Sequence, residues 1–492
     1  MRSRRRRRLE TPTPHPRTEE HHDHPFPADF LWGAATSAYQ IEGSLEADGR
    51  GPSVWDAFVR RPGAIEGGGD ASIAVDSYRR WRDDVELLAE LGMRAYRFSI
   101  GWSRVVPDGR GRIEERALDH YERIVDALLE RGIAPVVTLN HWDMPEALMD
   151  RRGWVDRSSV DAFVHYAEAV AGRLGDRVPW WITQNEPWII QLLGYQLGIH
   201  APGIADLGAA VAAGHHVLLA HGAAYDAMRP LVAGRIGAAP NLLPCVPASD
   251  SDADRAAAWA SDGYVNRWFL EPLLGQGYPD DMREHWERAT GGPLDVIRDG
   301  DEAAIRGRSD FLGVNYYTRR VMQAAEVGPD RPFPWQVVRA PEESRLSDEG
   351  TEIVPDALRE LLLRLHREYP GVPLMITENG LVSNETPQHD GEVHDVRRIR
   401  YLRQHVAAMA DAVAAGVPLV GYTHWSLFDN FEWSLGYRPR FGLVYVDYPT
   451  GERIVKHSAR HYAALVAAGG DLAAVPEHAA AESAVDSLGA FG

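Results

Sequence analysis

Two glutamates in this sequence stand at the ends of similar short apolar runs. WWITQNEP (180–187) places Glu186 after the first run, and LMITENG (374–380) places Glu378 after the second. A carboxylate is costly to bury unless it is paired or hydrogen-bonded, and Pro187 removes the backbone donor that a continuing strand would need. One such glutamate marks only the place where a strand reaches a loop. Two carboxylates that face each other across a sugar are what glycoside hydrolysis needs, by either a retaining or an inverting route.

The elements that would position these glutamates repeat along the chain. Eight apolar runs, separated by segments with helical periodicity such as 81–92 and 118–132, occupy 30–43, 95–100, 134–140, 180–186, 235–241, 311–317, 374–380 and 419–426. Repeated strand–helix units predict a parallel sheet covered by helices. Eight units favour an α/β fold, a single (β/α)8 TIM barrel. The alternative is an open doubly wound sheet, which the lack of a GxGxxG motif after the first strand makes weaker.

A barrel of this kind carries its active site at the C-terminal ends of the strands. We therefore expect one mouth to gather Gln40, Arg97, His141, Trp142, Asn185, Glu186, Asn315, Tyr317, Glu378, Asn379 and Trp425. Taken singly, His141 could be a core histidine and Asn379 part of a turn. Taken together, hydrogen-bonding groups beside aromatic faces favour a sugar-binding cleft over a phosphate or metal site.

Composition narrows the function classes. The chain has 492 residues and a formal net charge of -19, which argues against nucleic acid or an anionic membrane as the main partner. Cys245 is the only cysteine, so neither an intrachain disulfide nor a cysteine metal cluster is expected. No apolar run approaches the ~20 residues of a membrane span. We expect no metal, no cofactor and a cytoplasmic location, since the start lacks the apolar region of a secretory signal.

The composition also suggests where the globular part begins and ends. Residues 1–25 are rich in Arg, His and Pro, and 469–492 are rich in Ala with few large apolar side chains. We interpret the first segment as a disordered tail, in preference to a nucleic-acid or lipid patch, and the second as a loose tail. Residues 26–468 contain no linker and are expected to form one catalytic domain.

Seven motifs in order resemble glycoside hydrolase family 1, of the β-glucosidase type. They are FLWGAATSAYQIEG, YRFSIGWSR, VTLNHWDMPEAL, ITQNEP, FLGVNYYT, ITENG and WSLFDNFEWSLGYRPRFGLVYVDY, and the resemblance covers about 26–467. It implies a retaining enzyme with Glu186 as acid/base and Glu378 as nucleophile. Arg97 and Tyr317 would then keep Glu378 ionised. The apolar strand and the charge of Glu378 would raise the pKa of Glu186.

The same resemblance implies how the terminal sugar is bound. The expected substrate-binding residues are Gln40, His141, Trp142, Asn185, Asn315, Tyr317, Trp425, Glu432, Trp433 and Phe441. Asn185 would bind the 2-hydroxyl, and Trp425 would form the apolar platform. Relatives that act on 6-phosphorylated sugars replace the Glu432–Trp433 pair, because a carboxylate there would repel phosphate. Ser77 and Thr351 stand where the family often has His and Trp, at positions that look like scaffold or cleft rim.

The expected activity is hydrolysis of terminal non-reducing β-D-glucosyl residues from small β-glucosides and cellobiose-like oligosaccharides, a step in cellulose and polysaccharide degradation. Three alternatives are open: a β-galactosidase or β-fucosidase of broad specificity, a barrel that binds glycans without cleaving them, and a metal-dependent hydrolase. The last rests on Asp143 near His141, for which no second ligand motif is present. Both a monomer and a homo-oligomer are compatible with the sequence.

Overall fold

Eight parallel strands close into a barrel in the computed structural model, which describes residues 25–328, 331–339 and 345–477. Around the barrel the strands follow the chain, apart from one insertion: β1 (Leu31–Ala35), β2 (Ala95–Ser99), β3 (Ala134–Asn140), β4 (Trp180–Asn185), β5 (Arg235–Ala239), β7 (Phe311–Asn315), β10 (Leu374–Asn379) and β11 (Leu419–Trp425). β11 pairs with β1 and completes the ring. The predicted (β/α)8 barrel is confirmed, and the open sheet is excluded.

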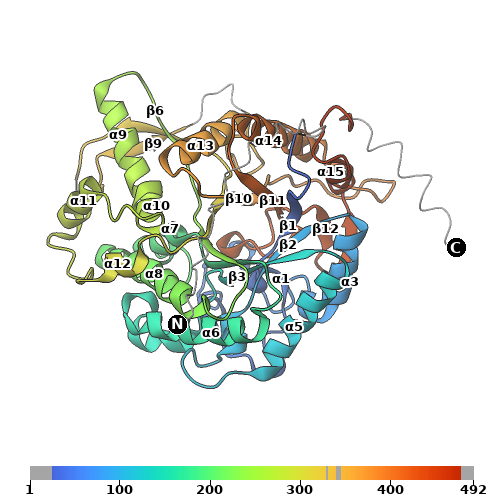
Figure 1. Ribbon diagram of the computed structural model, residues 1–492, viewed down its shortest axis with the longest axis horizontal. Coiled ribbons are helices and arrows are strands. Elements are labelled where there is room, and N and C mark those ends of the chain that lie inside the picture. Colours follow the sequence, from blue (N-terminus) through green and yellow to red (C-terminus); the bar gives the residue numbers. More distant parts are fainter. Residues whose placement is uncertain (1–24, 329–330, 340–344, 478–492) are drawn as a thin grey trace, which may run out of the picture.

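Helices encircle the strands (Figure 1). The long ones are α3 (Ser77–Glu90), α5 (Glu115–Glu130), α6 (Ser158–Leu174), α8 (Leu207–Met228), α13 (Pro355–Glu368), α14 (Val396–Ala414) and α15 (His457–Ala467). Most of them bury one apolar face, as the helical periodicity predicts, whereas α8 is buried nearly all round. After α5, Gly132 adopts the left-handed conformation that a helix C-terminus often requires.

The remaining helices and strands complete the fold. The helices are α1 (Ala38–Ile41), α2 (Val54–Phe58), α4 (Trp102–Val105), α7 (Pro187–Ile189), α9 (Asp252–Asp262), α10 (Trp268–Leu273), α11 (Asp280–Thr290) and α12 (Asp301–Ile305). A small sheet joins β6 (Cys245–Pro247), β8 (Arg320–Ala324) and β9 (Trp335–Val338), and a hairpin joins β12 (Val444–Asp447) and β13 (Glu452–Val455). The small sheet is the insertion around β7 that the eight-unit pattern did not predict.

The barrel interior is apolar at its lower level and polar above. Six buried side chains from six strands form the apolar level: Ala95, Val136, Ile182, Ala239, Phe311 and Met375. Two positions further along β2, Arg97 is fully buried and points to the same side as Ala95, since strand side chains alternate. Buried charge therefore begins directly above the apolar plug, at the C-terminal ends of the strands.

The two strands that carry the glutamates are irregular near their ends. The pairing of β10 with β7 shifts register between Ile376 and Glu378, and the pairing of β4 with β5 shifts between Ile182 and Asn185. Such bulges re-aim side chains at barrel rims and beside active sites. Glu186 follows β4 in a left-handed conformation, with φ of 49°. This backbone region is unfavourable for residues other than glycine, so the surrounding structure must hold it in place.

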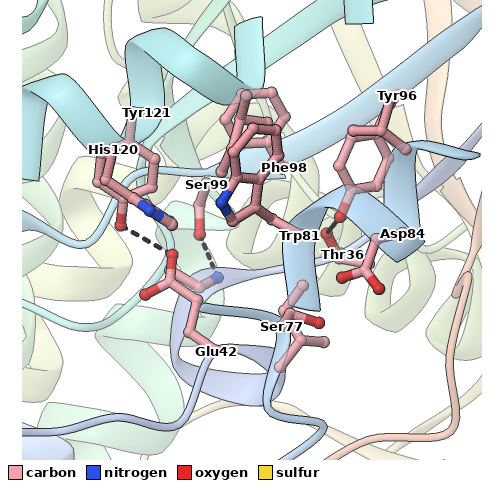
Figure 2. A pocket seen from close by; sticks show the side chains of 14 residues that line it. Thr36, Glu42, Ser77, Trp81, Asp84, Tyr96, Phe98, Ser99, His120 and Tyr121 are labelled. Atoms are coloured by element: carbon pink, nitrogen blue, oxygen red, sulfur yellow. Dashed lines mark hydrogen bonds between the residues drawn. The ribbon is translucent and has the colours of Figure 1, made fainter. Parts of the chain in front are cut away.

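The first apolar run is not a single strand. β1 ends at Ala35, and Gln40 lies in α1, so the expectation that Gln40 ends a strand was wrong. Figure 2 shows how the segment after β1 is anchored beside a cavity of about 30 Å³. The Ala38 amide donates to Ser99 Oγ at 2.6 Å, and Tyr121 Oη donates to Glu42 Oε1 at 2.8 Å. These bonds fix both ends of α1 and with them the direction of Gln40.

The structure also bears on two further expectations, the lack of a membrane-length apolar run and the end of the domain. By length and composition, α8 could span a bilayer, so the expectation that no apolar run approaches this length was wrong. However, 83% of the apolar stretch of this helix is buried within the protein. It is a core helix that packs on α6. The expected end of the domain at residue 468 lies within a packed region, because Val475 is buried and the Leu472 carbonyl accepts a hydrogen bond from Arg403. Residues 1–24 and 478–492 of the expected tails lie outside the described residues.

Candidate active site

Glu378 is surrounded by hydrogen-bond donors at the end of β10. Arg97 Nη1 donates to Glu378 Oε1 at 2.5 Å, and Tyr317 Oη donates to Glu378 Oε2 at 2.7 Å. The Arg97 side chain is fully buried and that of Glu378 is 4% exposed. Burial and the charge of Glu378 raise the pKa of Tyr317 well above its usual range. The phenol therefore keeps its proton and can donate a hydrogen bond. A carboxyl group with one oxygen held by each donor is oriented for attack as a nucleophile.

Glu186 has the opposite environment. Burial is the main cause that raises its pKa well above the usual range, and the charge of Glu378 raises it further. A hydrogen bond of 2.8 Å from Asn315 Nδ2 to Glu186 Oε1 opposes this shift, as does the charge of Arg97. The balance favours the protonated form, which a general acid requires. Two carboxyl groups with such different environments divide the acid and nucleophile roles between them.

Asn185 and Asn315 connect the two glutamates. Asn185 Oδ1 accepts hydrogen bonds from Arg97 Nη2 at 2.6 Å and from Asn315 Nδ2 at 3.0 Å. Thr377 Oγ1 donates to Asn315 Oδ1 at 2.7 Å and so fixes the orientation of that amide. The remaining Asn185 Nδ2 lies 3.2 Å from His141 Nε2. The same small set of donors therefore sets the geometry of both glutamates and of the residues beside them.

Gln40 and Glu432 lie together in the site. Gln40 Nε2 is 3.1 Å from Glu432 Oε2 and also donates to the Phe431 carbonyl at 2.9 Å. Ser37 Oγ donates to Gln40 Oε1 at 2.6 Å. Burial and the charge of Glu378 raise the pKa of Glu432 to about 8, against the hydrogen bond from Gln40. A buried carboxyl group next to an amide offers both acceptors and donors for adjacent sugar hydroxyls.

Aromatic rings line the space between these polar groups. The His141 ring stacks at 5.6 Å from Trp425 and at 5.9 Å from Trp433, and the Trp142 and Trp433 rings lie 4.7 Å apart. Phe441 meets Tyr317 edge-on at 6.0 Å. Burial and the charge of Arg97 lower the pKa of His141 well below its usual range, so its ring is neutral. Its Nδ1 has no hydrogen-bond partner among the described residues and can serve a ligand.

The structure brings every predicted site residue into this one region, with one exception among the strand ends. Asn379 does not face the mouth: its Nδ2 donates to the Tyr316 carbonyl and to Tyr401 Oη of α14. The expectation was wrong because neighbouring strand residues point to opposite faces, and Glu378 takes the inner one. Sequence reasoning missed Thr377 and Asn430, which accepts from Gln40 Nε2 at 3.0 Å. The sequence indicated these two residues only through their closeness to Glu378 and Glu432 along the chain.

The loop that carries Glu432 depends on a buried charge cluster. Asp429 accepts from Lys456 Nζ at 2.8 Å and from Arg440 Nη1 at 2.7 Å. Lys456 and Asp429 are fully buried. Lys456 is the single lysine of the chain, and the sequence alone indicated no role for it. Removing one partner of such a pair leaves an uncompensated buried charge, so the cluster fixes the loop strongly.

Asp143, the residue behind the metal-dependent alternative, lies buried close to His141 in the sequence. Burial and the charge of Glu42 raise its pKa to about 7, and its Oδ1 has no partner among the described residues. Within the described ranges, the group of His, Asp and Glu side chains close enough to hold a metal ion lies elsewhere and includes neither Asp143 nor His141. The geometry gives no support to a metal-dependent site here.

Comparison with known proteins matches this site to one family. The model of glycosyl hydrolase family 1 matches residues 22–471, nearly the whole chain. The chain belongs to glycosyl hydrolase family 1. Beta-glucosidase A of Thermotoga maritima is 41% identical over 443 residues, which cover 90% of this chain and 97% of that protein. A bifunctional beta-D-glucosidase/beta-D-fucosidase of Bifidobacterium breve is 42% identical and covers 90% of this chain and 98% of that protein.

Solved structures of the family have the same fold. The psychrophilic beta-glucosidase of Micrococcus antarcticus superimposes with a TM-score of 0.86 at 42% identity, covering 91% of this chain and 100% of that one. The family match extends well beyond the seven motifs, and it makes this chain a glycosyl hydrolase. The resemblance that the sequence motifs indicated is confirmed.

Proposed function

We propose that this family 1 enzyme is a β-glucosidase that releases terminal β-D-glucosyl residues from small β-glucosides and cellobiose-like oligosaccharides with retention of configuration. The observation that carries the proposal is the contrast between the two glutamates. Glu378 accepts hydrogen bonds from Arg97 and Tyr317, whereas burial raises the pKa of Glu186 well above its usual range. A retaining glycosidase needs one carboxyl group as a nucleophile and the other as an acid.

The reaction then proceeds in two displacements. A Glu378 oxygen attacks the anomeric carbon while Glu186 gives its proton to the departing glycosidic oxygen, which leaves as an alcohol. The resulting glycosyl ester removes the negative charge of Glu378, so the pKa of Glu186 falls and the carboxylate can accept a proton from water. That water attacks the anomeric carbon, the ester bond breaks, and Glu378 is ionised again. Each step conserves charge with these two side chains alone.

Sugar recognition follows from the rest of the site. The buried pair of Gln40 and Glu432 can bind adjacent hydroxyls, and the stacked rings of Trp425 and Trp433 offer apolar faces to the sugar. Proton NMR of the first product from a β-glucoside tests the proposal. We expect β-glucose to appear first and α-glucose to follow only by mutarotation. Early α-glucose would refute the double displacement.

A second substrate preference has specific support. The relative from Bifidobacterium breve is named for both glucosidase and fucosidase activity, at 42% identity over nearly its whole length. β-D-Fucosides lack the 6-hydroxyl and carry an axial 4-hydroxyl, so Glu432 would lose one hydroxyl partner and meet the other in a different position. Rates on matched nitrophenyl β-glucoside, β-fucoside and β-galactoside rank the three. A 1,4-beta-D-glucan glucohydrolase of Thermotoga neapolitana, 40% identical, supports including short glucans in the panel.

A further inference from the structure

Two segments that are far apart in the sequence meet at the N-terminal ends of α14 and α15. One is the loop before α14, with Asp390, Glu392 and His394, and the other is the start of α15 at His457. The His457 amide donates to the Val393 carbonyl at 3.1 Å and holds the two backbones side by side. Because Glu392 and His394 flank Val393, their side chains are brought to the His457 ring.

The potential ligand atoms of this cluster converge. One atom each from Glu392, His394 and His457 lies within 4.8 Å of the other two. His457 Nε2 is 2.5 Å from Glu392 Oε2, and the centroids of the two imidazole rings are 4.0 Å apart. His394 Nε2 lies 2.8 Å from Asp390 Oδ2, which adds a second carboxylate. Among residues 25–328, 331–339 and 345–477, the His, Cys, Asp and Glu side chains that lie close enough in a group of three or more to share a metal ion are Glu392, His394 and His457.

The chemistry of the donors selects a class of ion. Two imidazoles with one or two carboxylates match zinc and similar divalent transition metals, whereas calcium and magnesium prefer oxygen ligands alone. Zinc sites also hold their carboxylate ligands with a further hydrogen bond. Arg460 Nη1 supplies one, 3.3 Å from Glu392 Oε1, and leaves Oε2 facing His457. The His394 side chain is 31% exposed and that of Glu392 41%, so an ion can reach the cluster from solvent.

We propose that Glu392, His394 and His457 form a structural zinc site, with Asp390 or water as the fourth ligand. The expected ligand distances of about 2.0–2.2 Å require the side chains to close in by small rotations. A bound ion would link the loop before α14 to the start of α15 directly. The residues next in sequence extend this link inward: Ser458 donates to Asp395, and Asp395 pairs with Arg398.

Zinc binding by the full chain tests the site. Five histidines outside the described residues, His15, His21, His22, His24 and His478, could bind zinc themselves, so the test uses a background in which all five are alanine. In that background, calorimetry and metal analysis after gel filtration should find one zinc per chain, and zinc should raise Tm relative to a chelator-treated sample. No bound zinc in this background would overturn the proposal.

Variants then locate the ion. Outer partners of metal ligands are typically worth 10- to 100-fold in affinity, so losing a ligand in His394→Ala or His457→Ala should weaken binding by about 100-fold or more. His389→Ala is the matched control, because this exposed histidine is close in sequence but outside the cluster. Glycosidase activity reports whether each variant is folded. Active variants that keep full zinc affinity, or equal loss in His389→Ala, would show that the ion binds elsewhere.

Discussion

The hydroxyl of Tyr317 donates a hydrogen bond of 2.7 Å to Glu378, on the oxygen that Arg97 leaves free. Each nucleophile oxygen thus has one donor. The phenol is the weaker of the two because it carries no charge. It is also the one that can be removed without disturbing a buried ion pair.

Tyr317→Phe should therefore slow the first displacement without unfolding the protein. A hydrogen bond to a charged group contributes about 1.5–3 kcal/mol, so we expect kcat/KM on nitrophenyl β-glucoside to fall by roughly 10- to 150-fold. Thermal unfolding should change little, since the ring and its contact with Phe441 remain. A variant with unchanged kcat/KM would show that Arg97 alone orients the nucleophile.

The two glutamates should respond differently to truncation. With a dinitrophenyl glucoside, whose leaving group needs no acid, Glu186→Ala should still form the glycosyl-enzyme and then stall, and added azide should restore turnover as β-glucosyl azide. Glu378→Ala cannot form that intermediate, so azide should give at most the α-product. NMR of the azide products distinguishes the variants. An α-azide from Glu186→Ala would reverse the assigned roles.

The pKa of Glu186 should depend on the charge of its partner. Burial raises this pKa most and the charge of Glu378 second, so Glu378→Gln should lower it while leaving it above the usual range. Activity needs protonated Glu186, and wild-type kcat/KM should fall as pH rises through the pKa of this group. Carbon NMR of labelled glutamate, compared between wild type and Glu378→Gln, measures the shift. An equal pKa in both would mean that burial acts alone.

Glu432 should recognise sugar hydroxyls. Glu432→Ala should lose kcat/KM on glucosides by an amount near the 1.5–3 kcal/mol of a charged hydrogen bond. Substrates that lack the 4- or 6-hydroxyl should lose much less. Because its pKa in the free enzyme is about 8, hydroxyl donors that favour the ionised form should release a proton on binding below that pH. Calorimetry in buffers of different ionisation enthalpy detects this proton, and Glu432→Gln should abolish it.

Arg398 should matter for stability far more than a surface arginine. It is fully buried, pairs with Asp395 and donates to the carbonyls of Arg440 and Phe441 at 3.0 Å each. Arg398→Met leaves the buried Asp395 carboxylate without its opposite charge and should cost about 3–5 kcal/mol. Arg79→Met, which removes an exposed pair with Asp76, should cost under about 1 kcal/mol. Denaturant unfolding of both variants gives the comparison, and equal losses would contradict it.

The sequence predicted the barrel and both glutamates because local patterns encode them. Each strand is a short apolar run, and a polar residue at its end in a closed parallel barrel must lie at the mouth. Gln40 shows where this reasoning stops, since the chain turns into α1 before reaching it. Asn379 shows the second limit: whether a residue at a strand end faces inward depends on register, which periodicity over two or three residues cannot define.

Backbone strain was also invisible in the sequence. Glu186, Trp142 and Trp433 all adopt left-handed conformations that side chains rarely take, and all three are in the site. Nothing in their residue types indicates it, because glycine is the usual signal for such geometry. The same holds for Lys456, whose buried pairing with Asp429 links residues 27 positions apart. Contacts of this kind are set by tertiary packing and not by local propensity.

The register shifts in β10 and β4 have a consequence for insertions and deletions. Between Ile376 and Glu378 the chain already contains the irregularity that turns the nucleophile inward. Deleting or adding one residue there would reverse the alternation and turn Glu378 toward the helices, with a neutral neighbour, Thr377 or Asn379, facing the sugar. Loops beyond the strand ends can change length freely by comparison. Evolution and engineering of this enzyme can therefore vary the rim by insertion, while at these two strand ends only substitution is available.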